Sequence, residues 1–126
     1  MLERPQLNPP PQTILVVDDD HGVRESTREA MELEGYCVIE AADGREALKQ
    51  AKGSPRPHLI LLDMNMPIMG GREFLDTLLP EAEIASIPVL IISATLNSKN
   101  SVGAVDFLRK PVELDELLQK VAHHVR

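Results

Sequence analysis

The sequence predicts an α/β domain with a doubly wound parallel sheet, and two features of its 126 residues support this prediction. Residues 14–17 (ILVV) and 59–62 (LILL) are unbroken aliphatic runs, and each ends directly at an acid, Asp18 or Asp63. A strand covered on one face alternates apolar and polar residues, so these runs indicate strands that are buried on both faces. Amphipathic segments with helical spacing lie between the aliphatic segments, an alternation typical of parallel sheets covered by helices.

The first 12 residues are predicted to form a flexible, proline-rich tail, and residues 13–126 a single folded domain. Pro5 and the triplet Pro9, Pro10 and Pro11 prevent the tail from pairing in a sheet or continuing a helix. An extended or polyproline conformation is expected there, with a docking peptide as the alternative. The predicted strands of the domain cover residues 14–18, 37–41, 59–62, 89–92 and 105–108. The predicted helices cover residues 22–34, 44–51 and 71–79, and a final helix begins near residue 111.

Turn and cap residues set the ends of these helices. Gly35 ends the first helix, whose apolar face holds Val23, Thr27, Ala30 and Met31. Asp43 caps the second helix, with Glu46 as its capping-box partner, and residues 52–57 (KGSPRP) form the loop that follows. Pro80 closes the third helix, and Pro111 occupies the first turn of the last. The last helix carries an apolar stripe of Leu114, Leu117, Leu118, Val121 and Val125.

The chain order predicts the topology of the sheet. Five strands joined by right-handed crossovers favour a flavodoxin-like doubly wound (βα)₅ domain with a parallel five-stranded sheet in the order 2-1-3-4-5. The segment from Ser93 to Val105 leaves little room for a helix. The fourth helix is therefore predicted to be shortened, absent or disordered within residues 95–103.

The composition excludes several classes of protein. A hydrophobic content of 43% with 26% charged residues is globular. The net charge of −7 and the lack of a basic cluster interleaved with aromatic residues argue against direct nucleic-acid binding. The single cysteine, Cys37, excludes an internal disulfide, and its apolar neighbours predict a small buried thiol. The absence of a signal peptide, and of any apolar run near the roughly 18 residues of a membrane span, predicts a cytoplasmic protein without membrane contact.

Polar side chains follow four of the five predicted strands. They are Asp18 and Asp19, Asp63, Ser93 and Lys110. Because ligands of such sheets bind outside the carboxyl ends of the strands, we expect these side chains to converge. Three neighbouring carboxylates repel one another unless a hard cation such as Mg²⁺ lies between them. One carboxylate then remains to attack a phosphoryl group, with Lys110 compensating its charge.

The segments VVDDD, LLDMNMPIMGG, IISA and FLRKP resemble, in this order, those of the receiver domain of bacterial two-component response regulators, especially the stand-alone chemotaxis-type receivers. The resemblance covers residues 13–125. It implies that Asp63 is the phosphoacceptor. It also implies that Mg²⁺ (or Mn²⁺) binds to Asp18, Asp19 and Asp63, and to the backbone carbonyl of Asn65.

The resemblance assigns further roles near the carboxyl end of the chain. Lys110 contacts the phosphoryl group, and Ser93 supplies a hydroxyl that moves toward its oxygens beside the Ala94 amide. Phe107 occupies the aromatic switch position. Pro111 is expected to follow a cis peptide bond that aims the lysine into the site.

The function implied by the resemblance is that of a phosphoacceptor signalling domain. A sensor histidine kinase or a phosphotransfer protein would donate the phosphoryl group to Asp63, and the change would switch a surface that binds a downstream protein target. The domain is not expected to be an enzyme beyond its own phosphorylation and dephosphorylation. Only 17 positions separate Ser93 from Lys110, fewer than is usual in the family. The family's usual partner and dimer surface uses the fourth helix, the fifth strand and the fifth helix, so a monomer or weak dimer is expected.

Several residues have simpler structural interpretations. Asp20 fits as the cap of the first helix rather than as a ligand. Phe107 fits as a core residue, and it lacks a hydroxyl, so any switching would rest on packing. His123 and His124 fit a favourable interaction with the dipole of the last helix, since adjacent residues on a helix do not face each other. Met64, Met66 and Met69 fit as packing residues, because thioethers are poor ligands of Mg²⁺.

Two rival functions are kept as alternatives. A pseudo-receiver would keep the fold as a binding module that phosphorylation does not control, and the short fourth-helix segment favours it. A Mg²⁺-dependent phosphatase of the haloacid-dehalogenase class would use Asp18 and Asp20 as its paired acids. Gly22 stands where that class has Thr or Val, and the chain lacks a cap domain.

Overall fold

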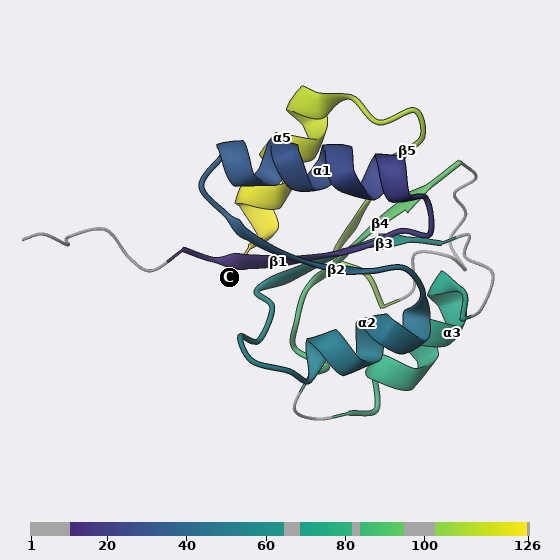
Figure 1. Cartoon of the computed structure of the whole chain (residues 1–126). Coiled ribbons are helices and arrows are strands. Elements are labelled where there is room, and N and C mark those ends of the chain that lie inside the picture. Colours follow the sequence, from purple (N-terminus) through teal and green to yellow (C-terminus); the bar gives the residue numbers. More distant parts are fainter. Residues whose placement is uncertain (1–10, 65–68, 82–83, 95–102, 126) are drawn as a thin grey trace, which may run out of the picture.

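The computed structural model describes residues 11–64, 69–81, 84–94 and 103–125. Within these residues a five-stranded parallel sheet is covered by helices on both faces (Figure 1). The strands are β1 (Thr13–Val17), β2 (Cys37–Ala41), β3 (Leu59–Asp63), β4 (Val89–Ser93) and β5 (Asp106–Arg109). The helices are α1 (His21–Leu33), α2 (Gly44–Ala51), α3 (Gly71–Leu78) and α5 (Leu114–His124). The sheet order β2-β1-β3-β4-β5 confirms the predicted topology.

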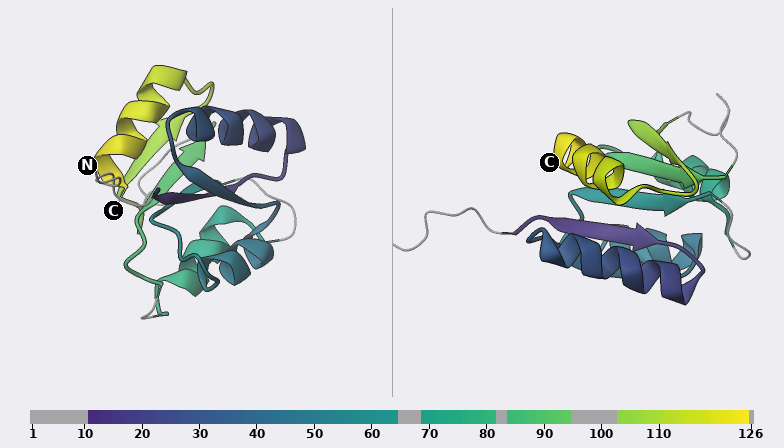
Figure 2. Two further views of the ribbon diagram at one scale, coloured as in Figure 1. Left: turned by 60° about the vertical axis from the view of Figure 1, so that its left-hand side comes forward. Right: turned by 90° about the horizontal axis from the view of Figure 1, so that it is seen from above.

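The two faces of the sheet support two separate hydrophobic cores. Helices α1 and α5 lie on one face, and α2 and α3 on the other (Figures 1 and 2). Strand β3 shows how one strand serves both: Leu59 and Leu61 pack toward α1 and α5, while Ile60 and Leu62 pack toward α2 and α3. An unbroken aliphatic run is therefore required in the central strands, because side chains on both faces leave water.

The ends of the first two helices follow the predicted signals. The Asp20 carboxylate accepts a hydrogen bond from the Val23 amide at 3.0 Å, which confirms it as the cap of α1. Gly35 adopts a φ of +95° after α1, a left-handed conformation that favours glycine. Asp43 accepts from the Glu46 amide at 2.9 Å, whereas the Glu46 carboxylate reaches back to the Ala42 amide rather than to Asp43 itself.

A close backbone approach joins the end of β3 to the start of α3. The Gly71 amide donates to the Met64 carbonyl at 3.2 Å. A Cβ atom at Gly71 would lie 2.7 Å from the Met64 Cα, so no larger residue fits there without moving the segment that follows Asp63. Met64 itself is buried in the core below α3, as its packing interpretation predicts.

Some side chains predicted to be buried are exposed, and three of them lie on edge strands or at the end of a helix. Cys37 lies on β2, and Phe107, which is 44% exposed, lies on β5. Strands β2 and β5 are the two edges of the sheet and each has one neighbouring strand, so only part of each strand is covered. Leu114 is 54% exposed because α5 begins at this residue, not near Pro111 as predicted, and its first turn lies at the rim of the core. The other predicted element boundaries agree with the structure to within one residue.

Some predictions concern residues outside the described part of the chain. The short or absent fourth helix was placed within residues 95–103, of which residues 95–102 are not described. Residues 1–10 of the proline-rich tail and the packing of Met66 also lie outside it. Gln12, the last residue of the predicted tail, is described, and its carbonyl accepts a hydrogen bond from the Cys37 amide at 2.9 Å, so the end of the tail pairs with β2. None of the helices in the described ranges has the length and apolar character that crossing a membrane requires.

Strand β5 is tied to α5 by a network around Asp106. Its carboxylate accepts hydrogen bonds from Lys120 Nζ at 3.1 Å, from His124 Nε2 at 2.9 Å and from the Phe107 amide at 2.8 Å. Burial alone would raise the pKa of Asp106, but these hydrogen bonds outweigh burial and hold the pKa below its ordinary value. Contact of His124 with this acid is a more specific role than the predicted interaction with the helix dipole.

Asp106→Asn is expected to lower the free energy of unfolding at neutral pH by about 1 kcal/mol, because the charge-assisted hydrogen bonds to Lys120 and His124 are weakened. Since the folded-state pKa of Asp106 is depressed, its ionised form stabilises the fold, and this contribution is lost as the pH falls below about 4. Urea denaturation at a series of pH values should therefore show the wild type and the variant converging in acid.

Glu29→Gln is the matched control, because it removes one exposed acid from the middle of α1. Its unfolding free energy should stay close to that of the wild type at every pH. Equal stability of Asp106→Asn and the wild type at neutral pH would contradict the proposed contribution of the network.

Candidate functional site

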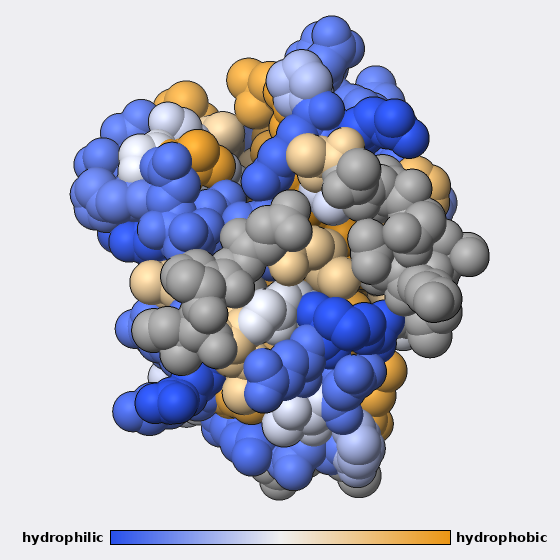
Figure 3. Space-filling view, turned by 90° about the vertical axis from the view of Figure 1, so that its right-hand side faces the viewer, coloured by the Kyte–Doolittle hydropathy of each residue, from blue (hydrophilic) through white to orange (hydrophobic). Residues whose placement is uncertain are grey.

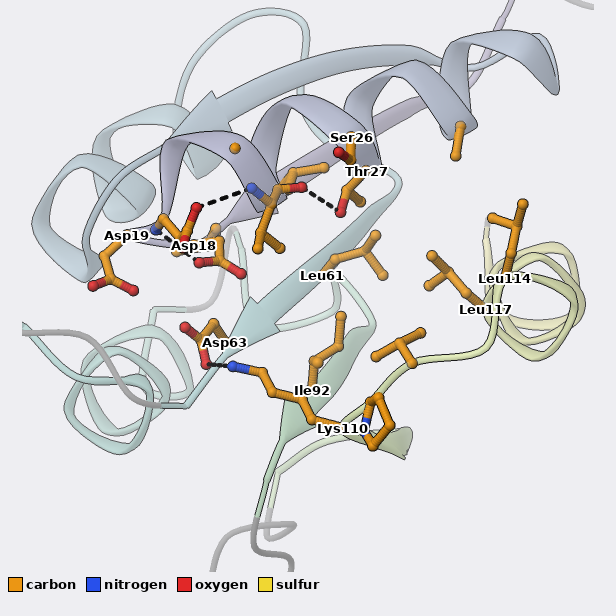
Figure 4. A pocket seen from close by; sticks show the side chains of 18 residues that line it. Asp18, Asp19, Ser26, Thr27, Leu61, Asp63, Ile92, Lys110, Leu114 and Leu117 are labelled. Atoms are coloured by element: carbon orange, nitrogen blue, oxygen red, sulfur yellow. Dashed lines mark hydrogen bonds and ion pairs between the residues drawn. The ribbon is translucent and has the colours of Figure 1, made fainter.

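Three carboxylates meet at the edge of the sheet toward which the strands point. Asp18 and Asp19 follow β1, and Asp63 is the last residue of the neighbouring strand β3. One oxygen from each of the three lies within 4.8 Å of the others, and Figure 4 shows the three side chains turned toward one another. The predicted convergence of these acids is confirmed, because parallel pairing of β1 with β3 brings their carboxyl ends together.

Two of the three acids are buried. Asp63 is 3% exposed and Asp18 is 7% exposed, whereas Asp19 faces solvent. Burial raises the pKa of the Asp18 carboxyl above its ordinary value, and the charges of Asp63 and Asp19 act in the same direction. The hydrogen bond from the Asp20 amide and the charge of Lys110 oppose this rise without cancelling it. The fold therefore holds anionic groups together at a cost in free energy.

Lys110 provides a positive charge to this cluster from the opposite side. Its Nζ lies 3.1 Å from the Asp63 Oδ1, and the pair is drawn as a dashed line in Figure 4. The lysine stands just beyond β5, and the peptide bond between Lys110 and Pro111 is cis, as the resemblance implies. The position of Lys110 after the fifth strand predicts that it lies close to Asp63, and the distance confirms this.

Ser93 lies beside the lysine at the end of β4. Ser93 is 1% exposed, and its backbone carbonyl accepts a hydrogen bond from the Lys110 amide at 2.9 Å. Because β4 lies between β3 and β5, Ser93 is adjacent to both Asp63 and Lys110 in the sheet. The structure thus places five of the predicted site residues at the ends of four neighbouring strands: Asp18, Asp19, Asp63, Ser93 and Lys110.

The remaining predicted site residues have different positions. Asn65, expected to bind a metal through its carbonyl, lies outside the described residues. Phe107 stands on the exposed side of β5, and Lys120 Nζ lies 5.4 Å from the centre of its ring. Asp20 accepts a hydrogen bond from the Val23 amide at the start of α1 and is not a member of the acidic cluster of the described residues.

The donor set fits a hard divalent cation. Carboxylate oxygens are the ligands that Mg²⁺ prefers, and a few such ligands leave its other positions to water. The cluster has three carboxylates within reach of one ion, one of them solvent-exposed, and no soft ligand takes part among the described residues. Burial is the main cause of the raised pKa of Asp18, and a cation would relieve the repulsion from Asp63 and Asp19 that adds to it.

A groove of about 920 Å³ extends from the acids between α1 and α5. Figure 4 shows its floor formed by Leu61 and Ile92 and one wall by Leu114 and Leu117 of α5. Val23, on the opposite wall, is 47% exposed, although its spacing predicted a contact with the core. In the space-filling view of this side of the molecule, apolar residues are exposed between hydrophilic ones (Figure 3). Sequence reasoning missed the groove, because helical spacing does not show how closely two helices pack.

Sequence reasoning also missed Arg24. This α1 residue is largely buried and donates to the Asp18 carbonyl at 2.8 Å. The sequence carried no signal for this contact, because the acceptor is a backbone carbonyl.

Residues 14–122 match the protein family described as the response regulator receiver domain. The chain is 40% identical over 116 residues to the response regulator MprA of Mycolicibacterium vanbaalenii, with 88% of this chain and 49% of that protein covered. It is also 40% identical over 113 residues to the response regulator MprA of Mycobacterium ulcerans, covering 86% of this chain and 47% of that protein. The chain therefore spans about half the length of the curated relatives it matches.

Solved structures resemble the chain over most of its length. The chemotaxis protein CheY4 of Vibrio cholerae aligns with a TM-score of 0.84 and 31% identity, covering 91% of this chain and 99% of that chain. The response regulator protein TrrA of Thermotoga maritima, solved in complex with Mg²⁺ and BeF, aligns with a TM-score of 0.81 and 30% identity, covering 90% and 99%.

Asp18→Asn is expected to raise the free energy of unfolding in EDTA at neutral pH by about 1 kcal/mol, because it removes one of three repelling charges and keeps an acceptor for the Asp20 amide. Since the folded-state pKa of Asp18 is raised, its ionised form destabilises the fold. The advantage of the variant should therefore appear as the pH rises through the raised pKa and vanish in acid.

Asp20→Asn serves as the control, because asparagine caps a helix about as well as aspartate and Asp20 lies outside the cluster. Its stability in urea denaturation should match that of the wild type. A loss of stability in Asp18→Asn without metal would show that repulsion in the cluster is not the dominant effect.

Proposed function

The chain belongs to the response regulator receiver domain family, and on this premise we propose that Asp63 accepts a phosphoryl group from a sensor histidine kinase or a phosphotransfer protein. Two features of Asp63 together support this proposal most strongly. Its buried carboxylate belongs to the acidic cluster, and it also forms an ion pair with Lys110. An acid with a purely structural role would require neither feature. This proposal makes the domain a signalling module that catalyses only its own phosphorylation and dephosphorylation.

We further propose that Asp18, Asp19 and Asp63 hold Mg²⁺, or Mn²⁺, together with the carbonyl of Asn65. When bound, the cation would neutralise the acids and the oxygens of an incoming phosphoryl group. The structure of TrrA, a similar response regulator, was solved with Mg²⁺ and BeF, which is in keeping with such a site. Close spacing of the three carboxylates is the feature of this chain that supports it.

The chemistry proposed for Asp63 is a direct displacement. A carboxylate oxygen attacks phosphorus, the P–N bond of the donor phosphohistidine breaks, and the imidazole leaves. Lys110, at 3.1 Å from Oδ1, holds the carboxylate in place and offsets the negative charge that gathers on the transferred group. Low exposure of Asp63 limits the approach of water, which favours transfer over hydrolysis.

The signal is proposed to travel through β4 and β5. Phosphorylation adds charge and strong acceptor oxygens at Asp63, which Ser93 and Lys110 are placed to bind. Because the Lys110 amide is bonded to the Ser93 carbonyl, movement of either residue is transmitted to the other strand. Phe107, exposed three residues before Lys110, is proposed to change its packing and so alter a surface that a downstream protein binds.

The groove between α1 and α5 is proposed to receive the protein that donates the phosphoryl group. It opens onto the acids at one end, and its half-exposed Val23 and Leu114 offer apolar contact beside the site. A donor seated there would bring its phosphohistidine to Asp63 without crossing α2 or α3. Exposed apolar residues next to a reactive group are typical of a docking surface.

Asp63→Asn is expected to abolish covalent modification by acetyl phosphate in the presence of Mg²⁺, because the amide oxygen is a poor nucleophile. Intact-protein mass spectrometry measures the gain of one phosphoryl group. Asp20→Asn is the matched control and should be modified like the wild type, since Asp20 caps α1 and is not a member of the cluster. Equal modification of Asp63→Asn and the wild type would refute the assignment of the phosphoacceptor.

Leu114→Asp is expected to slow transfer from a phosphorylated histidine kinase by at least about tenfold, since loss of a central apolar contact typically costs more than 1 kcal/mol. Modification by acetyl phosphate should be unchanged, because this small donor needs no docking surface. The rate of phosphoryl transfer to each variant, followed with a labelled kinase that phosphorylates the wild type, gives the comparison.

Leu33→Asp is the control for this experiment, as Leu33 is an exposed leucine at the far end of α1 and does not line the groove. It should accept phosphate from both donors like the wild type. If Leu114→Asp slows both donors equally, or neither, the groove is not the docking site of the kinase.

A further inference from the structure

We infer that Arg24 is a positioning residue for the acidic pair Asp18 and Asp19, through the peptide bond that joins them. This inference rests on the proposed function, because it concerns how well these acids are placed for Mg²⁺. Arg24 does not touch the carboxylates; it acts through the backbone of the segment that carries them.

The Arg24 side chain lies between the end of β1 and the neighbouring strand β2. It is 14% exposed, its Nη1 donates to the Asp18 carbonyl at 2.8 Å, and its Nε donates to the Glu40 Oε1 at 3.0 Å. Its Nη2 also lies 3.2 Å from the Nδ1 of His21. One guanidinium therefore spans a backbone carbonyl and a carboxylate on two different elements, which its fixed fork of donors allows.

The Asp18 carbonyl lies just beyond β1, where the hydrogen bonds of the sheet end. The Asp18 amide still bonds to the Ala41 carbonyl of β2 at 3.1 Å, and the Asp20 amide bonds to the Asp18 carboxylate at 2.9 Å. Between these two anchors lies the peptide from Asp18 to Asp19, and Arg24 binds its oxygen. The orientation of this peptide sets the direction of Asp19, which is exposed and receives little support from packing.

The charge of Arg24 is already balanced by its neighbours. Glu40 pairs with Arg24 and also with Arg28, whose Nη1 lies 2.6 Å from the Glu40 Oε2. Arg28 in turn pairs with Glu32, so two arginines face two glutamates. Arg24 is therefore best placed to act as a directional hydrogen-bond donor to Asp18, not as a counter-charge for the acids.

The test is the Mg²⁺ dissociation constant of the unphosphorylated chain, measured by titration calorimetry with Mg²⁺ alone. Arg24→Met and Arg24→Lys are both expected to weaken binding about tenfold, the lower end of the effect of losing a group that orients metal ligands. Lysine keeps the charge but cannot bridge Asp18 and Glu40 with a planar fork. Arg28→Met is the matched control, because it also breaks a pair with Glu40 but does not contact Asp18, and its affinity should remain close to that of the wild type.

Each outcome decides the inference. Unchanged Mg²⁺ affinity in both Arg24 variants overturns it. An equal loss of Mg²⁺ affinity in Arg28→Met also overturns it, because the effect would then come from the stability of α1. Full affinity in Arg24→Lys alone would show that charge is what matters and also overturns it. Thermal melting in EDTA accompanies each titration, and Arg24→Lys carries the test if Arg24→Met does not fold. A wild-type chain that binds no Mg²⁺ contradicts the proposed function itself and removes the inference with it.

Discussion

Mutual repulsion among three carboxylates is the main constraint on the candidate site of this structure. Asp18, Asp19 and Asp63 are held with oxygens within 4.8 Å of one another, and two of them are buried. Side chains on a flexible loop would move apart, but these acids are fixed by strands whose residues are packed on both faces. Rigid strands thus maintain an arrangement that is unfavourable in the absence of a cation and that a bound cation would stabilise.

Much of the fold could be predicted from the sequence, because the strongest signals depend on neighbouring residues and several of them support the same element. The aliphatic run before Asp63 indicated a strand covered on both faces, and Asp20, Gly35 and Asp43 marked helix ends by chemistry that acts over a few residues. The position of Lys110 was also predictable, because the strand order fixes which carboxyl ends are neighbours.

The errors came from properties that depend on tertiary neighbours. The apolar run at Cys37 suggested burial, but β2 is an edge strand and leaves the thiol exposed. Leu114 belongs to a helical stripe by spacing, yet the helix starts at this residue and the side chain stands at the rim of a groove. Arg24 was overlooked because its partner is a backbone carbonyl, which no residue pattern reveals.

The two-sided packing of the central strands has a consequence for how such a domain can diversify. Odd and even positions of β3 belong to different cores, one under α1 and α5 and the other under α2 and α3. Substitutions in the first layer can reshape the groove beside Asp63 while the second layer keeps the sheet intact. If the groove binds a partner as proposed, recognition and scaffolding lie on opposite sides of one strand, and a duplicated copy could acquire a new partner without rebuilding the acidic cluster.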